Sequence, residues 1–202
     1  MTVPGDRPTI PERYARALES SHLEATPERQ GDVDVLIAAG WAKDSLGTAL
    51  YRLRAEYDAV NKRELALVAN SRIARAIVMS QLQSLQPTKL RLTAYALKQA
   101  TINRVMLNDA DVMRIAAAAL AHWIDDRCPA CTGRGFSGGA GQPIVLCSLC
   151  RGTGTQRLSG SRSKRLGQNN TEHQFGALLL ERMDRKTAWV ASTMARWLRR
   201  FA

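Results

Sequence analysis

The residues best suited to chemistry are four cysteines, the only ones in the chain. They form two Cys-x-x-Cys pairs with 15 residues between the pairs: Cys128 with Cys131, and Cys147 with Cys150. Two intervening residues allow a tight turn to direct both sulfur atoms at one ion, and two such pairs complete a tetrahedral site. Each pair is followed by two glycines, which let backbone N–H groups approach the thiolates without a side-chain clash. We therefore expect one structural Zn²⁺ held by all four thiolates.

The same cysteines leave three other arrangements open: two disulfides, an iron–sulfur cluster, or redox-active pairs. His122 and His173 are conceivable ligands, but four thiolates already satisfy a zinc ion. A closed four-thiolate site has no open coordination position, so we expect no catalysis from it. Because residues 128–154 contain few apolar side chains, we expect metal binding to supply much of the free energy that folds this segment.

The whole chain has a formal net charge of +11, and the positive charge is concentrated in its last third. From Arg127 onward the chain has 13 Lys and Arg residues and 3 Asp and Glu residues, whereas the part before Arg127 has 16 Lys and Arg residues and 15 Asp and Glu residues. Arginine accounts for 11 of those 13 cations, and its planar guanidinium group suits phosphates and base edges. This asymmetry predicts a nucleic-acid-binding surface, with a merely solvated face as the alternative.

The composition predicts a mainly α-helical protein, because Ala and Leu dominate while aromatic residues make up only 5% of the chain. We expect a helical body, then a small four-cysteine zinc knuckle and β-hairpin module, then a C-terminal helix-turn-helix-like segment. The expected divisions are a flexible N-terminal arm (1–30), the helical body (31–126), the zinc-binding module (127–157), and the DNA-binding segment with the C-terminal helix (158–202).

Apolar residues recur at intervals of three and four in several stretches of the chain, as on one face of a helix. The expected helices cover 12–23, 32–58, 61–85, a stretch opened by Pro87, a stretch capped by Asn108 or Asp109 that ends near Ile124, and 171–201. Asp125 and Asp126 are expected at the solvated end of a helix. These stripes account for a helical core, and we find no catalytic constellation among them.

The segment after the second cysteine pair is a candidate helix-turn-helix. Ser159 or Ser161 can cap a short helix, Gly167 can end it, and Thr171 can cap the long last helix. Arginine and lysine would hold phosphates, while asparagine and glutamine can read adenine edges. The expected DNA-binding residues are Arg134, Arg151, Arg157, Ser161, Arg162, Lys164, Arg165, Gln168, Asn169, Asn170, Thr171, His173 and Gln174.

These features resemble the late-gene antitermination proteins of lambda-type bacteriophages, the Q proteins. The resemblance lies in the doubled Cys-x-x-Cys-x-Gly-x-Gly pattern and in the residues after it, Thr155–Ser159 and Lys164–Gly167. Asp34–Lys43 is a weaker match to an early helical segment of that family. The family usually has Trp early in its last helix, where this chain has Phe175.

The resemblance implies a sequence-specific DNA-binding antitermination factor. Such proteins bind double-stranded DNA overlapping a phage late promoter and engage bacterial RNA polymerase with its σ factor. They then suppress pausing and termination from a position near the RNA exit region, where nascent RNA is a further contact. By that resemblance, residues 127–174 would bind DNA and the helical body would face polymerase and σ, in the cytoplasm of a bacterial host at its nucleoid.

Two other classes stay open. One is a plain zinc-dependent DNA- or RNA-binding regulator. The other is a co-chaperone that binds unfolded polypeptide, since J-domain proteins carry a similar cysteine repeat; they usually have four copies, and this chain has two and no His-Pro-Asp. We expect no enzyme, since no phosphate-binding glycine loop or nucleophile–base pair is apparent. No apolar run is long enough for a membrane span, and no signal peptide is expected.

Overall fold

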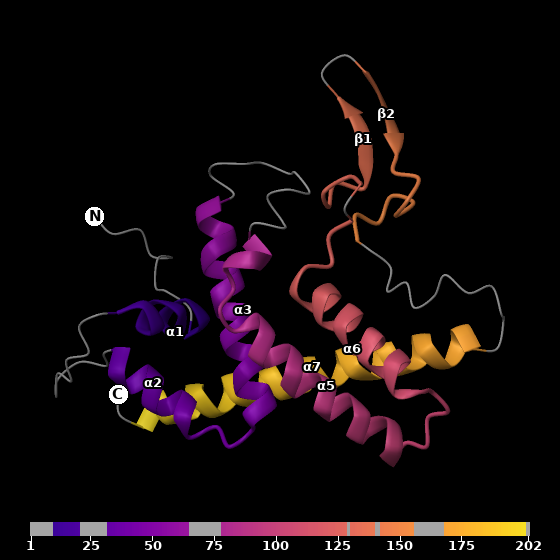
Figure 1. The fold of residues 1–202 in the computed structure, drawn as a ribbon. Coiled ribbons are helices and arrows are strands. Elements are labelled where there is room, and N and C mark those ends of the chain that lie inside the picture. Colours follow the sequence, from indigo (N-terminus) through magenta and orange to yellow (C-terminus); the bar gives the residue numbers. More distant parts are fainter. Residues whose placement is uncertain are drawn as a thin grey trace. The chain divides into compact units, whose positions relative to one another are not determined.

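The computed structural model describes residues 10–20, 32–64, 78–128, 130–139, 142–155 and 168–200. Its elements are α1 (Ile10–Glu19), α2 (Asp32–Gly40), α3 (Ser45–Glu64), α5 (Leu85–Ile102), α6 (Asp109–Ile124), β1 (Phe136–Gly139), β2 (Gln142–Leu146) and α7 (Gln168–Arg200). The expectation of a mainly helical protein with one small hairpin is confirmed (Figure 1). The turn expected between the two helices of the helix-turn-helix lies outside the described residues.

The chain divides into two compact units. The first comprises Met1–Leu67, Val78–Thr88 and Arg182–Ala202, and the second comprises Val68–Ile77 and Lys89–Glu181.

In the first unit, α1 packs against α2 and α3 around a core of small and aromatic side chains. The rings of Tyr14 and Tyr51 lie 5.5 Å apart between centroids, and those of Trp41 and Trp197 stack at 4.8 Å. Ala38, Ala39, Ala42 and Ala55 are buried, so backbones approach closely there. Much of the rest of this core comes from the C-terminal part of α7, through Val190, Met194 and Leu198.

The expected helical stretch at 32–58 is interrupted, and α2 and α3 are separate helices. Asp44 caps α3, because its Oδ1 accepts hydrogen bonds from the backbone N–H groups of Leu46 (3.1 Å) and Gly47 (2.8 Å). A Cβ on Gly47 would lie 3.0 Å from the carbonyl oxygen of Lys186, so glycine permits close packing of α3 on α7. The cap at Asp44 thus sets the start of α3 and separates it from α2, while Gly47 lies inside α3 and allows close packing.

Other helix boundaries also differ from those expected, beginning with α1, which covers Ile10–Glu19 instead of 12–23. Residues 61–64 belong to the end of α3, residues 78–81 are helical, and the centre of the stretch predicted at 61–85 lies outside the described residues. The next helix begins at Leu85, so Pro87 stands inside its first turn, where a missing N–H is tolerated. Ser84 anchors this start: its backbone N–H donates to Glu56 Oε2 (2.9 Å) and its hydroxyl to Oε1 of the same carboxylate.

In the second unit, α6 begins as expected after Asn108, whose side chain accepts a hydrogen bond from the N–H of Asp111 (2.8 Å). Its buried stripe contains Val112, Ile115, Ala116, Ala119, Leu120 and Ile124. Arg114 donates to Glu172 at 2.9 Å, which ties α6 to the first turns of α7. In these turns Phe175 and Leu179 are buried, as their spacing predicted. The last helix starts at Gln168, so Thr171 lies inside it and is not its cap.

Candidate metal centre

The four cysteine sulfurs form one buried cluster in the second unit. All four Sγ atoms lie within 4.8 Å of one another, and all four residues are at most 5% exposed. Two of the distances are 3.9 Å, between Cys128 and Cys147, and 3.6 Å, between Cys131 and Cys150. A tetrahedral ion with metal–sulfur bonds of about 2.3 Å would set its ligands about 3.8 Å apart. The four free thiols therefore fit a single tetrahedral metal ion.

The cluster is built from two copies of one knuckle, offset by 19 residues along the chain. In the first copy the backbone N–H of Gly135 points at Cys131 Sγ (3.2 Å), and in the second that of Gly154 points at Cys150 Sγ (3.3 Å). A residue with positive φ follows the second cysteine of each pair: Thr132 at 52° and Arg151 at 54°. Backbone N–H groups aimed at sulfur stabilise a thiolate and hold its orientation, which is the support that metal-binding cysteines need.

Each knuckle is closed by the other. The N–H of Cys128 donates to the carbonyl of Gly154 (2.7 Å), and the N–H of Cys147 donates to the carbonyl of Gly135 (2.9 Å). The residues just outside these pairs continue the exchange, with a bridge between Arg127 and Thr155. Its counterpart is the pairing of Phe136 with Leu146, which opens the β1–β2 hairpin. The site is therefore assembled only when both halves of the segment meet.

The inner glycine of each knuckle is required where the halves meet. A Cβ on Gly135 would collide with the carbonyl oxygen of Gly152, and a Cβ on Gly154 would collide with that of Gly133. Both inner glycines also have positive φ, 80° and 73°. The outer glycines have φ of 90° but more room: the nearest atom to a Cβ on Gly133 is Arg127 Cγ at 3.4 Å. The sequence predicts glycines beside the sulfurs, but the close approach of the backbone of each knuckle to that of the other is seen only in the structure.

The thiols differ in acidity because burial raises each pKa while hydrogen bonds from backbone N–H groups lower it, and the balance differs from one cysteine to the next. Burial raises the pKa of the Cys131 thiol to about 11. At Cys150 burial acts in the same direction, but the N–H of Gly154 and the Cys131 thiol outweigh it and lower the pKa to about 6. The N–H of Cys131 lowers the pKa of Cys128. A bound divalent cation favours the thiolate form at every ligand, so four buried sulfurs at one point are best satisfied by a metal.

An ion pair joins the metal centre to the end of α6. Asp125, 3% exposed in its side chain, accepts hydrogen bonds from Arg127 Nε (2.9 Å) and from the Arg127 backbone N–H (3.1 Å). A second guanidinium nitrogen of Arg127 donates to the other carboxylate oxygen at 3.1 Å. The solvated helix end expected at Asp125 is therefore wrong: the carboxylate is buried and held bidentately. Because Arg127 precedes Cys128 directly, this pair fixes where the first knuckle leaves the helix.

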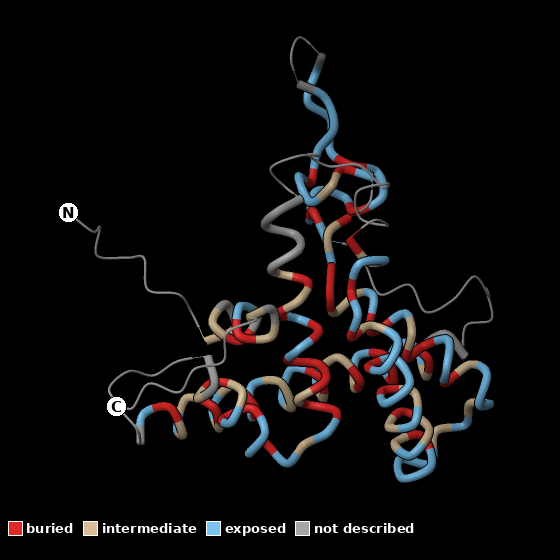
Figure 2. The backbone as a smooth tube through the Cα atoms, turned by 60° about the vertical axis from the view of Figure 1, so that its left-hand side comes forward, coloured by how far each residue is buried: buried red, intermediate tan, exposed pale blue. Residues whose placement is uncertain are grey.

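The hairpin that extends from the cysteines is exposed (Figure 2), and its large exposed side chains are apolar. Phe136 pairs with Leu146, so the two side chains share one face, and Ile144 lies on the same face two residues away. These side chains are 40%, 71% and 71% exposed, respectively. Gly138 bends β1, since it has φ of 100° and a Cβ there would collide with the carbonyl oxygen of Pro143. The sequence predicted a hairpin here but gave no sign that its apolar side chains face outward.

The residues predicted to bind DNA are only partly described. On the knuckles, Arg134 and Arg151 are exposed. In the first turns of α7, Asn170, His173 and Gln174 are exposed, and Thr171 is half-buried. Five of the predicted residues lie outside the described part: Arg157, Ser161, Arg162, Lys164 and Arg165. The side chains of Gln168 and Asn169 also lie outside it. The described residues thus provide an exposed polar face on α7, opposite buried Phe175.

Comparison with known proteins assigns no relatives. No family model matches the chain, and neither a search of curated proteins nor a search of solved structures found a match. Among the described helices, none combines the length and the apolar character that crossing a membrane requires.

Proposed function

We propose that this protein is a DNA-binding transcription antitermination factor whose DNA-binding region is stabilised by one structural zinc ion. The observation that carries the proposal is the cysteine cluster: four buried sulfurs within 4.8 Å, in two like knuckles, at the start of the strongly basic third of the chain. Zinc is the metal that four thiolates in tetrahedral geometry most often bind in a structural role. The proposal assigns no reaction to the site, because a closed four-thiolate centre has no open ligand position.

The support for DNA binding is electrostatic and local. Arg134 and Arg151 are exposed on the knuckles, within a stretch of net charge +10 from Arg127 onward. Asn170, His173 and Gln174 stand three and four residues apart on the exposed side of α7, the spacing of one helix face. Such a face can present amide groups to adenine edges while arginines hold phosphates. Antitermination itself, with σ-containing polymerase as the partner, rests on the resemblance of the cysteine segment and its flank to phage Q proteins.

A transcription assay tests this function. The DNA site is first selected from random duplexes and then placed over a σ-dependent promoter that lies upstream of an intrinsic terminator. The protein is expected to increase readthrough by σ-containing bacterial polymerase on this template and to leave a template without the site unchanged. Cys147→Ser removes one ligand and is expected to abolish the effect together with DNA binding. Unchanged readthrough with wild-type protein bound to its site would reject antitermination.

Duplex DNA binding can be tested separately from antitermination. Arg165→Ala is expected to weaken binding to every sequence and to lower the log–log salt slope by about 0.9, the share of one phosphate contact. Asn170→Ala and Gln174→Ala are expected instead to reduce discrimination between sites. If these two variants keep full discrimination, the recognition face is placed wrongly on α7.

One observation favours a second candidate, binding of unfolded polypeptide. The outward face of the hairpin, formed by Phe136, Ile144 and Leu146, is the kind of exposed apolar surface that contacts extended chains. A pull-down with a reduced, carboxymethylated protein distinguishes the two functions. Retention by the wild type but not by an Ile144→Ser, Leu146→Ser variant, with no response to duplex DNA, would favour the co-chaperone class.

A further inference from the structure

The β1–β2 hairpin carries apolar side chains on both of its faces, and they are open to solvent (Figure 2). One face has Phe136, Ile144 and Leu146, and the opposite face has Val145, which is 58% exposed. Residues 135–150 contain no Lys, Arg, His, Asp or Glu. An uncharged ribbon with apolar groups on both faces suits a partner that surrounds it better than a partner that covers one side.

Two exposed arginines flank this ribbon at its base. Arg134 stands two residues before β1, and Arg151 is held next to the end of β2, because its backbone N–H donates to the carbonyl of Cys147 (2.7 Å). Both arginine side chains are exposed, and in the described part of the chain neither forms a salt bridge. The ribbon and both arginines belong to the second unit. An anionic partner bound by these arginines would therefore meet the ribbon as well.

The charge of this part of the chain decides which class of partner fits the ribbon. A second copy of the protein would bring together two segments that each carry a net charge of +10 from Arg127 onward, and electrostatic repulsion opposes that contact. A polyanion is attracted instead. Duplex DNA is the partner already proposed for Arg134 and Arg151, so the ribbon continues the same proposed surface.

The dimensions of the ribbon select one groove of the duplex. A two-stranded ribbon with side chains on both faces is about 10 Å thick. The major groove is about 12 Å wide and admits such a ribbon, whereas the minor groove is only about 6 Å wide. The apolar group that base pairs present in the major groove is the C5-methyl group of thymine. Ile144 and Leu146 can contact this methyl group, but they offer no hydrogen bond to the polar base edges.

We propose that the hairpin lies in the major groove of duplex DNA, where Ile144 and Leu146 contact thymine methyl groups while Arg134 and Arg151 hold phosphates beside the groove. The hairpin thus favours A·T pairs through their methyl groups, independently of any base contact made by α7. This inference rests on the duplex-DNA binding proposed above, but it does not depend on antitermination.

Removing the methyl groups from the DNA tests the contact without changing the protein. Binding of the full-length protein to fluorescent duplexes of equal length is measured by anisotropy at low salt. One duplex is alternating dA·dT, and the other has dU in place of every dT. The two duplexes have the same charge and the same minor-groove edges, because uracil lacks only the methyl group. Each buried methyl group is worth about fourfold in affinity, so two contacts predict binding to the dT duplex that is tighter by about tenfold or more.

Two variants assign this preference to the hairpin. The double variant Ile144→Ser, Leu146→Ser is expected to bind the dT and dU duplexes about equally. Leu90→Ser is the matched control, since Leu90 lies on α5 and is as exposed as the two hairpin residues, 72% against 71% for each of them. The control is expected to keep the wild-type preference for dT. The zinc content is expected to be equal in all three proteins, because the substituted side chains are exposed.

The outcomes separate this inference from the DNA binding on which it rests. Equal affinity of the wild type for the dT and dU duplexes overturns the hairpin contact and leaves DNA binding in place. A preference for dT that survives in the double variant also overturns it. No binding to any duplex rejects DNA binding itself, and the hairpin contact with it. If the double variant keeps the dT preference but is no longer retained by carboxymethylated polypeptide, the hairpin face binds polypeptide instead.

Discussion

The reciprocal contact of the two knuckles makes their four glycines unequal, and alanine substitutions measure the difference. At every one of these positions alanine must adopt positive φ, which costs about 1–2 kcal/mol. At Gly133 little is added, because the nearest side-chain atom would be an ordinary 3.4 Å away. At Gly154 the new Cβ would overlap the carbonyl oxygen of the opposite knuckle. Moving a closely packed backbone adds about 1–3 kcal/mol, so we expect about 1–2 kcal/mol for Gly133→Ala and about 2–5 kcal/mol for Gly154→Ala.

Because metal binding and folding of this segment are expected to be linked, these costs should appear in zinc affinity. Titration against a chromogenic chelator is expected to show affinity reduced about 5- to 30-fold in Gly133→Ala, and about 30-fold to several thousand-fold in Gly154→Ala. The other outer and inner glycines provide a replicate. Gly152→Ala is expected to be mild, because its Cβ would lie 3.2 Å from the flexible end of the Leu146 side chain, and Gly135→Ala to be severe, because its Cβ would overlap the carbonyl oxygen of Gly152. Equal losses at Gly133 and Gly154 would refute the reasoning, because backbone strain alone would then account for both.

Three other perturbations follow from single contacts. The buried hydroxyl of Tyr51 has no hydrogen-bond partner among the described residues, so Tyr51→Phe is expected to leave the free energy of unfolding in urea unchanged or to raise it by up to about 1 kcal/mol; a clear loss would reveal a missed partner. Burial opposes ionisation of Asp44, but Lys186 and the two backbone N–H groups bonded to the Asp44 carboxylate outweigh burial and lower the pKa of Asp44. As pH drops below about 4 the unfolded chain takes up this proton first, so the free energy of unfolding should fall there. Asp44→Asn should lack this part of the pH dependence, and an identical pH profile in both proteins would contradict it. Asp125→Asn removes the buried partner of Arg127, whose own side chain is 39% exposed, and is expected to cost about 1–2 kcal/mol; a double-mutant cycle with Arg127→Gln that shows no coupling would contradict the anchoring role.

The parts of the fold that the sequence predicted are those set by local patterns. Asn108 caps α6 because its side chain reaches an N–H three residues away, and that arrangement can be recognised without tertiary structure. The buried stripe that includes Phe175 and Leu179 follows from helical spacing alone. The cysteine cluster was also predictable, since the spacing within and between the pairs encodes it.

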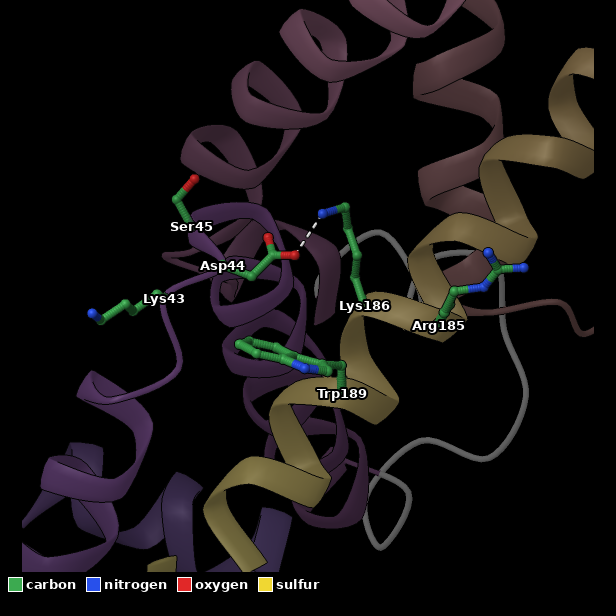
Figure 3. Close-up of a pocket in the computed structure, with 6 residues that line it drawn as sticks. All are labelled: Lys43, Asp44, Ser45, Arg185, Lys186 and Trp189. Carbon is green, nitrogen blue, oxygen red and sulfur yellow. Dashed lines mark hydrogen bonds and ion pairs between the residues drawn. The ribbon is translucent and has the colours of Figure 1, made fainter. Parts of the chain in front are cut away.

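Features that depend on distant partners were not predictable. The break before α3 is made by Asp44, whose carboxylate is held by Lys186, 142 residues further along the chain. The burial of Asp125 at the end of α6 was also not predictable, because it depends on the ion pair with Arg127. A pocket next to Trp189 was not predictable, because its cations come from the loop before α3 (Lys43) and from α7 (Arg185 and Lys186), which only the tertiary fold brings together (Figure 3). The outward face of the hairpin was hidden for another reason: a glycine-rich segment has no periodicity from which to assign sides.

The claim on which the rest depends is that Cys128, Cys131, Cys147 and Cys150 hold one zinc ion in a closed tetrahedral site. X-ray absorption at the zinc edge, on protein purified without added metal, tests it directly. We predict one zinc per chain, surrounded by four sulfur atoms at about 2.3 Å with no nitrogen or oxygen ligand. A shell with fewer than four sulfurs, iron in place of zinc, or metal-free protein with intact disulfides would contradict it.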